Sequence, residues 1–363
     1  MLSPLKSRID EIERVMRAHD LDAFADGLSE LVRQARELSP GELTRVIGEL
    51  AVLLPDIGGA YARLAVLAGA CVEWGGSPLP LVEALPRRAA EALETAEVFR
   101  GAWESATRGR ALPDRDKDDQ DKVLRRLVRK SRRTNLSDED AVMAVSAWFD
   151  VVDWLKCAIT VLGRADFRRG MAASDRRRLS AAAEPLAEHL SRAHWVHGLC
   201  RVLDDEPLIV LDRLTGRGFR LTMSGVGDNF QLHTLLADRL GGPDGPALPH
   251  VGPVEPAWLA AATTGEQKVP SADAVVRRFR LFDGTGEYVY PEGVPADIEP
   301  TEGVRVLVLH PPRGRYLWLA GRVYRHMVPV LTLDGELSPE QAAAWFGRIG
   351  VARETDLMAA QPA

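Results

Sequence analysis

Apolar residues in the first half of the chain recur at intervals of three and four, which is the spacing of one face of an α-helix. The clearest pattern runs over 137–162, where Ser137 stands as the N-cap and three acidic residues follow in the first turn. Pro185 interrupts a further helical pattern over 174–203 and predicts a kink or a second helix start. Residues 1–203 are therefore predicted to form an all-helical domain.

From Glu206 onward the apolar positions alternate, as they do in strands with one buried face. Pro329 has no N–H donor, so the last of the predicted strands is expected at a sheet edge. Ser338 begins a capping-box pattern that predicts a final helix, and the proline- and glycine-rich segment 241–256 predicts a loop. Residues 204–363 are predicted to form an α+β domain with a mixed or mainly antiparallel sheet. The predicted strands cover residues 207–212, 218–224, 275–282, 287–290, 304–310, 316–320 and 328–333.

Composition changes this interpretation little, because 46% hydrophobic and 27% charged residues are ordinary for a globular protein. Basic and acidic residues balance over 1–203, so the net charge of −6 belongs to 204–363. Neither half has the basic excess of a surface that binds duplex nucleic acid. Nucleic acid is therefore an unfavoured partner, and another protein is the expected one.

Cysteine usage and the N-terminal sequence indicate a cytoplasmic protein. Cys71, Cys157 and Cys200 are far apart, odd in number and set in apolar helical patterns, as in a reducing compartment. The first residues are charged and lack the apolar core of a secretory signal. No run approaches the ~20 apolar residues that span a bilayer, so no transmembrane insertion is expected.

One segment, 216–240, combines glycine, carboxylate, amide and imidazole groups at the predicted start of a helix. Asp228, Asn229, Gln231 and His233 are therefore candidate ligand-binding residues. The structural alternative is that Asp228 and Gln231 form a capping box and His233 packs in the core. Asn229 and His233 lie four residues apart, on one side of the predicted helix.

Two further clusters carry candidate chemistry. His194, His197 and Cys200 follow one another at steps of three, so two of them could bind zinc from one helix face. The glutamate base of the H-E-x-x-H motif is absent, and a partly buried helix end with solvated histidines is the preferred interpretation. No metal and no cofactor are predicted.

A basic amphipathic segment over 122–133 is preceded by a run of aspartates. A helix of this kind can dock on an acidic protein surface, or its charges can be neutralised by the neighbouring acids. The candidate protein-docking residues are Arg125, Arg126, Arg129 and Arg133.

No complete catalytic motif occurs in the sequence. The leading hypothesis is therefore a non-catalytic cytoplasmic interaction or adaptor protein built on the two domains. The alternative is a small-molecule-binding protein or an enzyme, with its site on the strand, loop and helix at 224–233. In that case an arginine from the C-terminal strands would assist the site.

Overall fold

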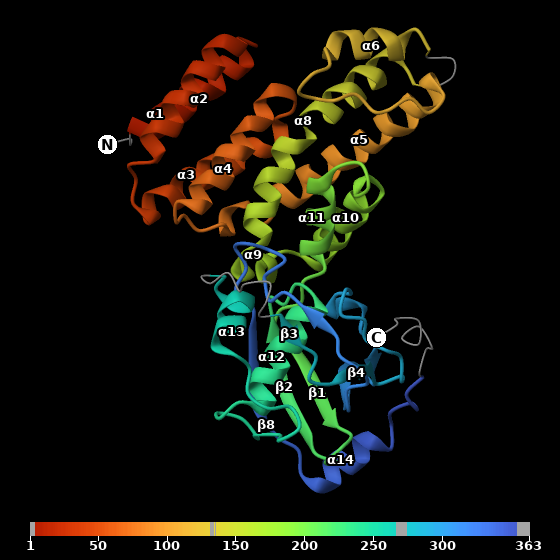
Figure 1. Cartoon of the computed structure of the whole chain (residues 1–363). Coiled ribbons are helices and arrows are strands. Elements are labelled where there is room, and N and C mark those ends of the chain that lie inside the picture. The colour runs from red at the N-terminus through yellow and green to blue at the C-terminus, as the bar shows by residue number, and fades with distance from the viewer. Residues whose placement is uncertain (1–3, 131–133, 135, 266–273, 354–363) are drawn as a thin grey trace. The chain divides into compact units, whose positions relative to one another are not determined.

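The computed structural model describes residues 4–130, 134, 136–265 and 274–353. The chain divides into two compact units, the N-terminal unit Met1–Cys200 and the C-terminal unit Arg201–Ala363. The first is helical and the second is α+β with a mixed, mainly antiparallel sheet, which confirms the predicted fold class (Figure 1).

Local sequence signals set the helix boundaries of the N-terminal unit. Ser137 accepts a hydrogen bond from the Asp140 backbone N–H at 3.0 Å and donates its own N–H to the Asp140 carboxylate, so the predicted cap is confirmed. Pro185 lies in a 3₁₀ turn between two helices, which confirms the second start. The 3₁₀ turns are η1 (Leu54–Asp56), η2 (Gly59–Ala62), η3 (Leu79–Leu81) and η4 (Glu184–Leu186). The α-helices are α1 (Pro4–Arg17), α2 (Leu21–Ala35), α3 (Pro40–Leu53), α4 (Arg63–Glu73), α5 (Ala84–Thr107), α6 (Gln120–Val128), α8 (Asp138–Leu162), α9 (Ala165–Gly170), α10 (Ala173–Ala183) and α11 (Ser191–Cys200).

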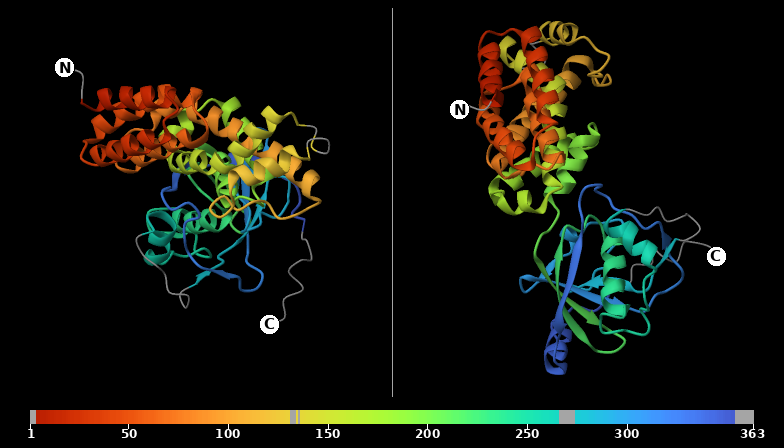
Figure 2. Two further views of the ribbon diagram at one scale, coloured as in Figure 1. Left: turned by 90° about the horizontal axis from the view of Figure 1, so that it is seen from above. Right: turned by 90° about the vertical axis from the view of Figure 1, so that its left-hand side faces the viewer.

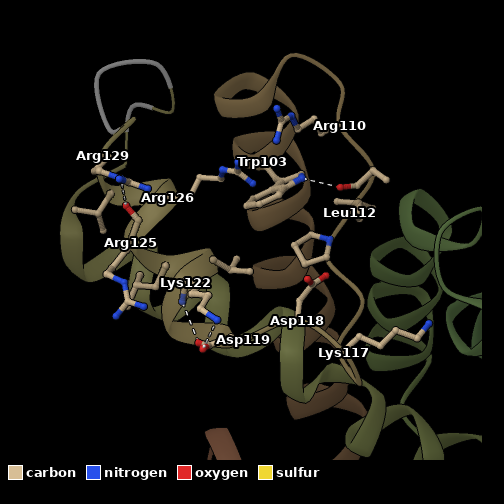
Figure 3. Close-up of a pocket in the computed structure, with 15 residues that line it drawn as sticks. Trp103, Arg110, Leu112, Lys117, Asp118, Asp119, Lys122, Arg125, Arg126 and Arg129 are labelled. Carbon is tan, nitrogen blue, oxygen red and sulfur yellow. Dashed lines mark hydrogen bonds and ion pairs between the residues drawn. The ribbon is translucent and has the colours of Figure 1, made fainter.

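The long helices α5 and α8 pack together at the centre of the N-terminal unit. Phe99 of α5 stacks on Trp148 of α8, with ring centroids 5.3 Å apart, and on Trp103 at 5.8 Å. The Trp103 indole also donates to the Ala111 carbonyl at 3.0 Å, which fixes the loop after α5 (Figure 3). In the part of the chain that the structure describes, no helix has the length and apolarity needed to cross a bilayer.

A mixed sheet organises the C-terminal unit, in the order β4-β6-β1-β2-β8, with β5 paired to β6. The pair β1–β6 is parallel and the other pairs are antiparallel. The strands are β1 (Glu206–Asp212), β2 (Gly218–Ser224), β4 (Arg280–Asp283), β5 (Pro300–Thr301), β6 (Val304–His310) and β8 (Val330–Glu336), and β3 (Val275–Val276) pairs with β7 (Leu317–Trp318) in a separate ribbon. The remaining elements are α12 (Asn229–Gly241), α13 (Pro256–Thr263), the 3₁₀ turn η6 (Pro295–Asp297) and α14 (Pro339–Phe346).

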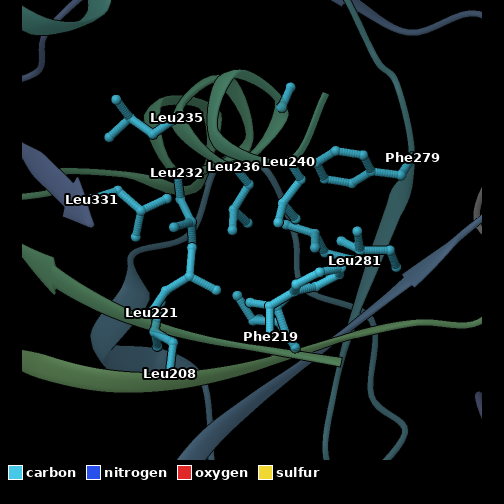
Figure 4. Close-up of a cluster of buried hydrophobic side chains, with 14 of the residues drawn as sticks. Leu208, Phe219, Leu221, Leu232, Leu235, Leu236, Leu240, Phe279, Leu281 and Leu331 are labelled. Carbon is cyan, nitrogen blue, oxygen red and sulfur yellow. The ribbon is translucent and has the colours of Figure 1, made fainter. Parts of the chain in front are cut away.

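Alternation along the strands separates two apolar layers. On one face, Leu208, Phe219 and Leu221 pack under Leu232 and Leu236 of α12 (Figure 4; Figure 2 gives further views of this helix against the sheet). The opposite face carries a second buried cluster that includes residues of α14. That cluster contains Ile209, Leu211, Phe282, Val306, Val308, Leu337 and Ala342.

The strand predictions hold where pairing is regular and fail near the ribbon. β8 is an edge strand, as the proline predicts, but it begins at Val330, after Pro329. The segment predicted as one strand over 275–282 divides into β3 and β4, which belong to different sheets. Residues 287–290 form only an isolated bridge from Tyr288 to Phe282. The predicted strand over 316–320 shortens to Leu317–Trp318.

Candidate functional site

The loop before α12 is held by backbone hydrogen bonds. Gly225 has a φ of +67°, and a Cβ there would lie 3.2 Å from the Val328 carbonyl oxygen, so the turn requires glycine. The Gly225 N–H donates to the Leu203 carbonyl, and the Asn229 N–H donates to the Gly293 carbonyl, both at 2.9 Å. These N–H groups are used within the fold, so they do not form an anion cradle.

Asp228 and Gln231 have structural roles at the start of α12. Asp228 caps the helix by accepting from the Gln231 backbone N–H at 2.7 Å. The Gln231 side chain binds the Gly227 N–H at 2.7 Å and donates to the Ala262 carbonyl of α13 at 2.6 Å. The predicted capping box is therefore half correct, because the glutamine reaches back one residue further than the capping residue.

Asn229 and His233 instead line a shared cavity of about 10 Å³, here called the α12 cavity. Both side chains are buried, as are Arg277 and Trp318. Arg277 directly follows β3, and Trp318 is the last residue of β7, the strand that pairs with β3. The His233 ring stacks on Phe279 at 4.1 Å between centroids and meets Trp318 edge-on at 4.8 Å. The cavity is lined by Asn229, His233, Arg277, Phe279, Leu281, Tyr288, Val289, Pro291 and Trp318.

Hydrogen bonding fixes the state of the two polar groups on α12. The His233 Nε2 accepts from the Arg278 backbone N–H at 3.2 Å, so a neutral ring carries its proton on Nδ1. Burial lowers the pKa of His233 to about 3; the Phe279 backbone opposes this shift, and the cations Arg277 and Arg278 add to it. The Asn229 amide donates through Nδ2 to the Tyr290 carbonyl at 2.8 Å, which directs Oδ1 as an acceptor. Next to them, burial raises the pKa of Asp228 to about 6.

Sequence reasoning did not identify Arg277 and Trp318. A detectable signal existed for Arg277, because it has the same parity as Val275, Phe279 and Leu281, all of which are buried. An arginine on the apolar side of an alternating pattern marks a buried cation. Trp318 offered no comparable signal, since tryptophan is ordinary in a strand.

The three metal candidates do not converge. The His197 Nδ1 is hydrogen-bonded to the Ser180 hydroxyl and carbonyl, each at 3.2 Å. His194 is exposed, and the Cys200 thiol is buried with its pKa raised to about 12 by that burial. Within the described residues no group of three or more histidine, cysteine, aspartate or glutamate side chains is arranged to hold a metal ion.

A larger hollow, here called the α6 groove, lies between α6, the end of α5 and the loop that joins them (Figure 3). Its volume is about 1160 Å³, and its lining includes Arg125, Arg126 and Arg129 of α6, with Arg110 on the loop. Arg126 lies over the Trp103 ring at 5.8 Å. Arg133, the fourth predicted docking residue, lies outside the described residues. The lining also contains apolar side chains, namely Trp103, Ala111, Leu112, Pro113, Val123, Leu124 and Val128.

Two of the acids near α6 pair with lysines. Asp114 binds Lys117 at 2.6 Å, and Asp119, the N-cap of α6, binds Lys122 at 3.4 Å. The arginines Arg110, Arg125, Arg126 and Arg129 are exposed and form no ion pair with any described carboxylate.

Comparison of the chain with protein-family models, with curated proteins and with solved structures found no match. The candidate sites are therefore defined by their geometry alone.

Proposed function

We propose that this protein is a non-catalytic adaptor whose α6 groove binds an acidic segment of another protein. The observation that carries the proposal is the combination of a groove of about 1160 Å³ with arginines that have no ionic partner among the described residues. Asp114 and Asp119 are engaged by lysines, and no described carboxylate forms an ion pair with the arginines, so self-neutralisation does not account for the arginine positions.

Shape and polarity favour a peptide over a small molecule. Pockets for small ligands commonly have volumes of ~300–1000 Å³, and the α6 groove exceeds that range. Its lining includes the buried Trp103 and Val123, while the arginines that line it are exposed. Buried apolar side chains beside exposed cations complement a segment in which acidic residues flank an apolar side chain.

Binding of a defined peptide tests the proposal. A fluorescein-labelled peptide in which glutamates flank a single leucine is titrated with the full chain and followed by fluorescence anisotropy. We expect saturable binding that weakens with added salt, because exposed charges are screened. Replacing Arg125, Arg126 and Arg129 together by glutamate should weaken binding at least about tenfold, since each exposed ion pair contributes up to ~1 kcal/mol.

The matched control reverses three other exposed arginines of the N-terminal unit, Arg14, Arg45 and Arg177, which changes the net charge equally. Equal losses in the two triple variants would indicate attraction by overall charge and would contradict the proposed groove. A single-stranded oligonucleotide or phosphatidylserine vesicles that compete more strongly than the peptide would also contradict it.

We further propose a reducing compartment, the cytoplasm. Cys71, Cys157 and Cys200 are free and buried, and burial raises the pKa of each thiol. Such thiols behave as small apolar side chains. Cell fractionation tests the location, and recovery in a secreted or membrane fraction would contradict it.

A further inference from the structure

We infer that the α12 cavity is a binding site for the carboxylate end of a small ligand that also carries a hydrogen-bond donor, such as a hydroxy acid. Four side chains that line this cavity each hold a buried polar atom without a hydrogen-bond partner in the described structure. These atoms are Asn229 Oδ1, His233 Nδ1, Arg277 Nε and Trp318 Nε1. Buried polar groups are almost always paired, so four such atoms on side chains that line one cavity favour a bound group there.

The chemistry of the four atoms selects the ligand. Arg277 Nε and Trp318 Nε1 are N–H donors, and His233 Nδ1 is a third because its Nε2 already accepts from the Arg278 N–H. Asn229 Oδ1 is an acceptor, since the amide nitrogen of the same side chain donates to the Tyr290 carbonyl. The three donors suit one carboxylate oxygen, which can accept more than one hydrogen bond, and the acceptor suits a neighbouring hydroxyl or amino group.

Charge points in the same direction. Arg277 is 5% exposed, and no described carboxylate forms an ion pair with it. Its Nη groups contact the Tyr288 hydroxyl and the Arg313 carbonyl, which are neutral. A buried guanidinium held only by neutral acceptors favours an anion beside its remaining N–H.

Size determines how the ligand would sit. At about 10 Å³ the α12 cavity holds roughly one water-sized group, so one ligand oxygen fits inside it. Tyr288 and Pro291, which line the same cavity, are partly exposed. The rest of the ligand therefore extends past these two residues toward solvent.

Titration of the full chain with glycolate, the simplest hydroxy acid, tests this inference. The protein is labelled with ¹⁵N at the indole nitrogens, and the Trp318 resonance is assigned by its loss in Trp318→Phe. We expect a saturable shift of that resonance with glycolate, a smaller response to acetate, which lacks the donor, and no response to sodium chloride at equal ionic strength. Calorimetry should give affinity at least about tenfold lower for Trp318→Phe, because one hydrogen bond to a charged group is lost.

Trp258→Phe is the matched control, since Trp258 has similar burial in the same apolar cluster and does not line the cavity. Unchanged affinity in that variant supports the assignment, and equal weakening in both variants overturns it. If Trp318→Phe does not fold, a crystal structure of the unaltered protein in glycolate still decides. A Trp318 resonance that does not move with glycolate, or a crystal structure in glycolate with only a water in the cavity, would overturn the inference.

Discussion

His233 is a buried imidazole whose protonation is coupled to the stability of the C-terminal unit. Its pKa falls from 6.5 to about 3 on folding, so the unfolded chain binds this proton more readily at every pH between those values. The contribution of His233 to stability is therefore fully present above pH 6.5 and is lost progressively as the pH falls toward 3. His233→Phe removes the titrating group and keeps an aromatic ring against Phe279 and Trp318.

The pH dependence has a calculable size. With these two pKa values, lowering the pH from 7 to 5 destabilises the unaltered protein by about 2 kcal/mol through His233 alone. The variant should be less stable at pH 7 by ~1–3 kcal/mol, because the Arg278 N–H loses its acceptor. At pH 5 that difference should shrink by about 2 kcal/mol. Other titrating groups, including Asp228, act in both proteins and largely cancel in the comparison.

Urea denaturation of both proteins at pH 7 and pH 5 gives the four free energies. Hydrogen exchange followed by mass spectrometry assigns the change, since peptides from α12 should lose protection at pH 5 while peptides from α8 should not. A stability difference that is the same at both pH values would refute the neutral, desolvated state of His233. Loss of protection in α8 alone would show that another group controls the transition.

Two further predictions concern stability. Burial raises the pKa of Asp228 to about 6, so its charged form is penalised and the stability of the protein falls as the pH rises from 4 to 6. Asp228→Asn keeps the cap acceptor and should therefore stabilise the protein at pH 7 by up to about 3 kcal/mol. The same urea assay should show no gain below pH 4. A lower stability of that variant at pH 7 would contradict the pKa direction. A Cβ on Gly69 of α4 would lie 3.1 Å from the Cys157 Cα of α8, so Gly69→Ala should cost ~1–3 kcal/mol, whereas Gly101→Ala in the open part of α5 should gain ~0.5–1 kcal/mol. Equal melting temperatures for these two glycine variants would argue against the close approach of α4 and α8.

Helix starts were predictable because their causes are local. Ser137 and Ser338 each form a hydrogen bond with a group three residues away, so a short stretch of sequence contains the whole interaction. The change of apolar period near Glu206 is local as well, and it marks where the strands begin.

Strand pairing depends on residues distant in sequence, so the sheet class was predicted but the register was not. The parallel pair joins Leu208 of β1 to Arg305 of β6, and no local pattern specifies that register. Residues 275–282 alternate as one strand would, yet the backbone leaves β3 after Val276 and joins the main sheet only at Arg280. Arg277 lies in the segment between the two strands, and its side chain donates hydrogen bonds to the Tyr288 hydroxyl and the Arg313 carbonyl.

In the candidate sites, too, the locally determined features were predictable and the long-range ones were not. The pairing of Asn229 with His233 follows from helical spacing, and both residues line the α12 cavity. Their partners Arg277 and Trp318 come from far along the chain, so the donor set could not be assembled before the fold was known. The polarity of Asp228 and Gln231 made them candidate ligand-binding residues, but in the structure their side chains accept hydrogen bonds from backbone N–H groups at the start of α12.

The exposed arginines of α6 and the buried Arg277 differ in how strongly their charge favours a bound partner. Arg125, Arg126 and Arg129 are exposed, and water solvates an exposed guanidinium at little cost, so their lack of ionic partners alone demands no ligand. What favours a partner there is the groove they line. Arg277 is buried, and a buried charge is costly unless it is paired and hydrogen-bonded. Its unpaired Nε therefore favours a bound group, so glycolate should stabilise the C-terminal unit even in the variant whose α6 arginines are reversed.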